Sequence, residues 1–79
     1  MKNKEIDFPQ FRMLSNGKSF YKIIDDRNFK EIQIIGTRKL KFEIHAAQFP
    51  EILRIQDMLA TKNNLFIAID ENKWLEIKD

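Results

Sequence analysis

The chain has 79 residues, of which 43% are hydrophobic and 33% are charged, and its formal net charge is +2. This length suffices for one domain, and the composition is typical of a globular protein rather than a disordered one. The chain has no cysteine, which excludes disulfides, thiolate catalysis and zinc–thiolate sites. We therefore expect a single domain over residues 1–79, in which residues 1–8 form a flexible arm that ends at Phe8-Pro9.

Charge is distributed unevenly along the chain. Residues 1–41 carry ten Lys and Arg against five Asp and Glu, whereas residues 42–79 carry four against seven. A basic first half is typical of a protein with an acidic partner, although two halves of opposite charge can equally attract each other in the fold. The start lacks the apolar stretch of a secretory signal, and the apolar run 65–69 is too short to cross a bilayer. These features predict a cytoplasmic protein.

The first half of the chain predicts two hairpins. Residues 11–14 form a short edge strand, 15–18 hold an Asn-Gly turn, and 19–25 are rich in aromatic and β-branched residues. A polar break precedes a further strand at 29–35, and residues 36–39 connect it to a strand at 40–47. This last strand alternates most clearly, with one face apolar and the other facing water: Leu40, Phe42, Ile44 and Ala46 against Lys41, Glu43, His45 and Ala47.

The periodicity then changes to that of a helix. Pro50 suits a first helical turn, and Ile52, Ile55 and Leu59 follow at helical spacing, which predicts a helix over about 50–60. The apolar run 65–69 predicts an inner strand covered on both faces.

The last segment allows two structures. Residues 71–78 form either a short helix or a returning edge strand. The helix is slightly favoured, because Asp70 can cap it while Ile69 and Trp74 form a hydrophobic staple. The sum is an α+β fold, in which an antiparallel sheet of four to five strands is covered on one face by one main helix.

Three segments carry a resemblance. FRMLSNGKSFYKI (11–23), EIQIIG (31–36) and PEILRIQDML (50–59) resemble a group of short, uncharacterised bacterial proteins. The similarity covers most of residues 9–77. It supports one domain and implies no activity, ligand or catalytic residue.

No grouping of residues predicts catalysis, a metal or a cofactor. His45 is the only histidine, and no nucleophile or second ligand accompanies it. Asp25 and Asp26 could hold Mg²⁺, but Asp-Asp-Arg-Asn between apolar runs is typical of a turn. Gly17-Lys18-Ser19 lacks the upstream glycine of a phosphate-binding loop. An enzyme or small-ligand carrier is therefore the third hypothesis, and it requires a sizeable pocket lined by His45, Asp25 or Glu43.

The leading hypothesis is a non-catalytic module that binds a protein partner or a second copy of itself. Its contact is expected at the strand 40–47 or on the sheet face around Tyr21. The candidate interface residues are Tyr21, Lys41, Glu43, His45 and Trp74.

The second hypothesis is binding of single-stranded DNA or RNA by the basic first half. Cations that contact phosphates and rings that stack on bases are the usual means of such binding. The candidate contacts are Arg12, Lys18, Tyr21, Lys22, Arg38, Lys39 and Lys41.

Overall fold

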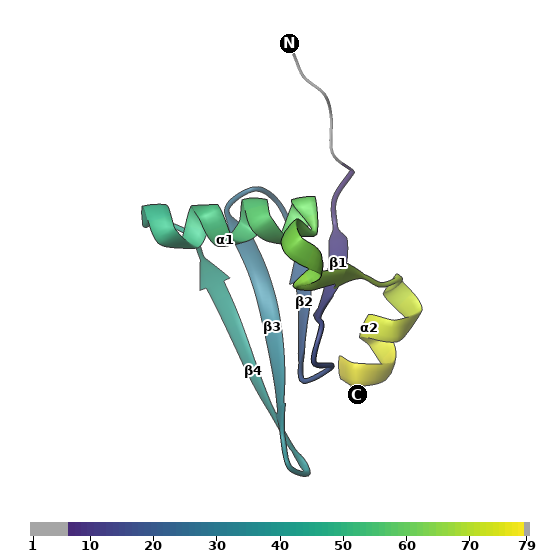
Figure 1. Ribbon diagram of the computed structural model, residues 1–79. Coiled ribbons are helices and arrows are strands. Elements are labelled where there is room, and N and C mark those ends of the chain that lie inside the picture. Colours follow the sequence, from purple (N-terminus) through teal and green to yellow (C-terminus); the bar gives the residue numbers. More distant parts are fainter. Residues whose placement is uncertain (1–6, 79) are drawn as a thin grey trace.

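The computed structural model describes residues 7–78, so residues 1–6 of the predicted arm lie outside the described part (Figure 1). In chain order the elements are β1 (Gln10–Leu14), β2 (Ser19–Ile23), β3 (Asn28–Ile35), β4 (Arg38–His45), α1 (Phe49–Ala60), a 3₁₀ turn (Lys62–Asn64), β5 (Phe66–Ala68) and α2 (Glu71–Lys78). The predicted α+β class is confirmed, with one main helix and a short C-terminal helix.

The strands form one antiparallel sheet in the order β4-β3-β2-β1-β5. The longest pairing joins β3 to β4, from Asn28 opposite His45 to Ile35 opposite Arg38. The eight-residue β4 is one edge of the sheet, and the three-residue β5 is the other. In Figure 1 the β3–β4 hairpin extends far beyond α1, so that much of its length has no helix above it.

A glycine at positive φ closes each predicted hairpin. Gly17 has φ 75° and Gly36 has φ 63°, a region that glycine enters without a Cβ clash. The Asn16 side chain supports the first turn by accepting a hydrogen bond from the Lys18 N–H at 2.8 Å. Because Ile35 pairs directly with Arg38, the second turn is tighter than expected, and β4 begins two residues before the predicted strand.

One face of the sheet, here called face A, packs against α1. The buried members of this core are Tyr21, Ile23, Phe29, Ala46, Ile55, Met58 and Phe66. The Tyr21 ring lies 5.6 Å from that of Phe66 and 6.2 Å from that of Phe29, measured between centroids. The helix crosses only one end of the sheet (Figure 1), which limits the area of face A that it covers.

The opposite face, here called face B, packs against α2. Its buried members are Phe11, Phe20, Ile32 and Trp74. The side chain of Asp70 accepts a hydrogen bond from the Lys73 N–H at 2.9 Å, and Ile69 packs on the cluster that contains Trp74. The helical alternative for residues 71–78 is therefore the correct one.

Two strand predictions were wrong. Residues 65–69 were expected to form an inner strand, but β5 is a short edge in which Ile67 is 41% exposed. The predicted edge strand, β1, instead lies between β2 and β5. The chain returns from α1 beside β1, so the run 65–69 forms the edge of the sheet there. This run is apolar because Phe66 packs in the core under α1 and Ile69 packs on the core under α2.

Candidate functional site

The side of β4 that faces away from β3 is the longest free strand edge among residues 7–78. The Ala46 N–H donates to Arg27 O, so Arg27 and Ala46 form a hydrogen-bonded pair next to the β3–β4 ladder. Every second pair along an antiparallel ladder is of this kind, so Ile44 and Phe42 also direct their backbone groups toward β3. The Ile34 N–H donates instead to Lys18 O, on the opposite side of β3, which agrees with this alternation. The N–H and C=O groups of Lys41 and Glu43 consequently point outward and can accept a further strand.

Face A has an apolar strip beside this edge that α1 does not reach. Phe42 is 42% exposed and Ile35 is 55% exposed, while Leu40 is half-buried. A small hollow of about 140 Å³ lies at the end of the hairpin, lined by Ile35, Arg38 and Leu40. Phe42 was expected in the core. It lies on the expected face, but the helix covers only the other end of that face.

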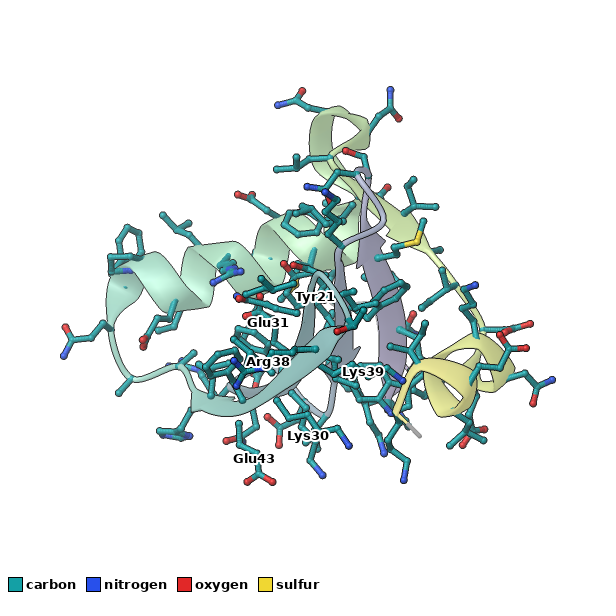
Figure 2. The ribbon with its side chains drawn as sticks, turned by 90° about the horizontal axis from the view of Figure 1, so that it is seen from below. Tyr21, Lys30, Glu31, Arg38, Lys39 and Glu43 are labelled. Carbon is teal, nitrogen blue, oxygen red and sulfur yellow. The ribbon has the colours of Figure 1, made fainter. Side chains whose placement is uncertain are left out.

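Arg54 of α1 forms the boundary between the core and this strip. Its guanidinium carbon lies 5.5 Å from the centroid of the Tyr21 ring, and its Nη2 lies 3.2 Å from Tyr21 Oη and 3.5 Å from Glu31 Oε1. The other carboxylate oxygen of Glu31 accepts a hydrogen bond from Gln33 Nε2 at 2.9 Å. Figure 2 shows Tyr21 and Glu31 on the side of the sheet toward α1. These contacts satisfy a buried carboxylate, so we assign Glu31 a structural role.

Asn28 links His45 to the turn that precedes β3. His45 Nδ1 and Asn28 Oδ1 are 2.8 Å apart, and Asn28 Nδ2 donates to both carboxylate oxygens of Asp25, at 2.9 and 3.1 Å. Because the amide nitrogen of Asn28 is committed to Asp25, its oxygen must accept from His45, which assigns the proton to Nδ1.

An open hollow of about 330 Å³ adjoins His45. Its lining residues are Ile24, Asn28, Phe29, Lys30, Glu43, Ile44 and His45. The hypothesis of an enzyme or small-ligand carrier requires a pocket near these residues. However, no hydroxyl or thiol is among the lining residues, so the hollow lacks the side chains that an imidazole base usually activates as nucleophiles. The hollow therefore adds little support for catalysis.

Titration of the Asp25 carboxylate tests the hydrogen bonds in the turn that precedes β3. Hydrogen bonds from the Arg27 N–H and then from the Asn28 side chain hold the pKa of Asp25 below its ordinary value of 3.8. A carboxyl group with a depressed pKa stabilises the fold at higher pH and loses this contribution as the pH falls through the folded-state pKa. We expect an NMR titration midpoint below 3.8 for Asp25. Asn28→Ala should move the midpoint upward, and an unchanged midpoint would contradict the assignment.

The structure separates the residues proposed to contact nucleic acid. Arg12 is buried, with Nε donating to Met58 O at 2.8 Å, and Tyr21 is 1% exposed. Lys18 lies in the first turn and Arg38 at the end of the β3–β4 hairpin. Lys22, Lys39 and Lys41 lie on face B by strand alternation. The Tyr21 ring is therefore closed to a stacking base.

Lysines of β4 also serve α2. Lys39 Nζ donates to Ile77 O at 2.7 Å, and Lys41 Nζ donates to Lys78 O at 2.8 Å. Cations at these last carbonyls favour the helix, whose dipole is negative at its C-terminus. Sequence reasoning assigned these lysines to binding and missed this role.

Three of the five predicted interface residues lie together. Lys41, Glu43 and His45 alternate along β4, whereas Tyr21 and Trp74 are buried in the cores of opposite faces. The prediction missed two exposed apolar side chains near this edge, Phe42 and Ile35. Alternation alone assigned Phe42 to the core, and Ile35, next to Gly36, lies beyond the reach of the helix.

Neither helix within residues 7–78 is long and apolar enough to cross a membrane. In the same part of the chain, no group of three or more His, Asp or Glu side chains is placed to hold a metal ion. The chain matches no protein-family model, and neither a curated protein nor a solved structure is significantly similar to it.

Proposed function

We propose that this chain is a small non-catalytic module that binds protein by accepting an extended segment at the β4 edge. The observation that supports this most strongly is the combination of eight edge residues with an uncovered apolar strip beside them. In strand addition, main-chain hydrogen bonds supply affinity and alternate side chains supply specificity. Lys41 and Glu43 offer the backbone groups, and Phe42 offers an apolar contact.

The alternative of nucleic-acid binding has weaker support. Its two most distinctive contacts, Arg12 and Tyr21, are buried among α1 and the strands. Two of its lysines, Lys39 and Lys41, extend along face B toward the C-terminal end of α2, where they donate to Ile77 O and Lys78 O. What remains is a set of dispersed cations, which is also typical of a solvated face.

A proline at position 41 tests the edge without breaking the sheet. The Lys41 N–H points away from β3, so Lys41→Pro removes no hydrogen bond within the sheet but blocks an incoming strand. Peptides are first selected from a random library for binding to the original chain. Those that bind at the β4 edge should bind Lys41→Pro at least tenfold more weakly than they bind the original chain. Lys41→Ala is the matched control, because it loses the same side chain and keeps the N–H.

Hydrogen exchange locates the bound peptide. Binding should slow exchange of the Lys41 and Glu43 amides, since these become hydrogen-bonded in the complex. If the selected peptides bind Lys41→Pro as tightly as the original chain, or protect other amides only, the β4 edge is not the site.

A further inference from the structure

The β4 edge is complementary to itself. Along this strand Lys41 and Glu43 are separated by one residue, Phe42, and their side chains lie on face B. When two such strands run antiparallel about Phe42, each Lys41 faces Glu43 of the other strand. Leu40 faces Ile44 and Phe42 faces its own copy on face A. Opposite charges and apolar side chains in directly opposed positions are the pairs that stabilise sheets.

We propose that the occupant of the β4 edge is a second copy of this chain, paired antiparallel about Phe42, so that two five-stranded sheets become one continuous sheet. This inference rests on the proposed function and adds the identity of the partner. The backbone hydrogen bonds of the proposed pairing can also form. In this register Lys41 of one copy and Glu43 of the other are the hydrogen-bonded pairs, and the N–H and C=O groups of these two residues point away from β3.

Only this register places Lys41 opposite Glu43. A pairing centred on Lys41 sets two lysines against each other, although it also places Lys39 opposite Glu43, and one centred on Glu43 sets two carboxylates against each other. Edge lysines usually prevent strands from pairing, because they repel one another. Here the carboxylate two residues away converts the same lysine into an attractive contact, but only in the register centred on Phe42.

The charged groups are available for this exchange. The side chain of Glu43 is 81% exposed, and its ion pair with Lys30 spans 3.9 Å. Lys41 Nζ donates to the carbonyl oxygen of Lys78 through one of its three N–H groups, which leaves two for a carboxylate. Figure 2 shows Glu43 beside Lys30 on the side of the sheet away from α1, where a neighbouring strand can reach it.

The first turn of α1 adds a second contact. In both views this turn projects beyond the end of β4, past the edge of the sheet (Figures 1 and 2). It carries Phe49, which is 69% exposed. A strand added to β4 lies beneath this projection, so that the second copy reduces the exposure of Phe49 as well as that of Phe42.

Charge reversal tests the pairing through sedimentation equilibrium. The original chain should dimerise with concentration, and Lys41→Glu and Glu43→Lys should each weaken the dimer at least tenfold by creating two like-charge pairs. The double variant should restore the dimer. An equimolar mixture of the two single variants should form a heterodimer, because each then supplies the charge that the other lacks. Circular dichroism of each variant establishes that it is folded.

Two outcomes overturn the proposal. One is an original chain that stays monomeric up to about 1 mM, well above the micromolar range of weak protein complexes. The other is a dimer that the double variant and the mixture do not restore, or that Lys41→Pro leaves intact. A monomer that still binds selected peptides at β4 refutes the second copy alone, whereas a monomer that binds none there also refutes the proposed function.

Discussion

Trp74→Ala is expected to lower the free energy of unfolding by about 3–5 kcal/mol, the usual cost of removing a large aromatic side chain from a core. Trp74 is 3% exposed and packs with Phe11, at a centroid distance of 6.2 Å, and with Phe20 and Ile32. An isolated helix as short as α2 is unstable in water, so α2 depends on this packing. A domain of this size is stable by only about 4–12 kcal/mol.

Urea denaturation followed by far-ultraviolet circular dichroism measures this effect. Leu75→Ala is the matched control on the same helix, because Leu75 is 42% exposed and its loss should cost less than 1 kcal/mol. Hydrogen exchange should show α2 released before the sheet unfolds. A loss below about 1 kcal/mol for Trp74→Ala would show that α2 does not cover face B in solution.

Local patterns predicted most of the elements. Aromatic and β-branched residues indicated β2, alternation indicated β4 most clearly, and helical spacing indicated α1, because each pattern depends only on residues close in the chain. The same alternation puts Phe29 and Glu31 of β3 on one face, where they lie opposite Ile44 and Phe42 of β4. The first hairpin turn followed from its Asn-Gly pair, because the conformational freedom of glycine is a local property.

Features that depend on distant segments were not predictable in this way. Alternation says which face Phe42 occupies but not how far a helix extends over that face, and that distance decides its exposure. The hydrophobicity of residues 65–69 gives no information about which strand they join. The β4 edge was among the predicted contacts, but its complementary register required the hydrogen-bonding pattern of β3, which the sequence does not reveal.

Arg12 is the clearest residue that sequence reasoning misread. It was proposed as a surface cation, yet it is 7% exposed and lies on face A beneath the end of α1. Nε donates to Met58 O at 2.8 Å and Nη2 to Leu59 O at 3.3 Å, while Nη1 donates to Phe11 O at 2.8 Å. The last turn of α1 has no basic residue of its own, so β1 supplies the cation that helix ends favour.

Arg12→Met is therefore expected to lower the free energy of unfolding by about 2–4 kcal/mol. Methionine retains an apolar stem but loses the guanidinium hydrogen bonds to the carbonyls of Phe11, Met58 and Leu59, and a hydrogen bond to a charged group is worth about 1.5–3 kcal/mol. Arg12→Lys should recover only part of the loss, because one ammonium cannot reproduce the guanidinium's separate, directed contacts. Lys18→Ala, on an exposed turn, should change stability by less than about 0.5 kcal/mol.

Chemical denaturation of the three variants measures these differences. Equal stabilities for Arg12→Met and Lys18→Ala would show that α1 does not need the guanidinium, and would return Arg12 to the residues available for a ligand.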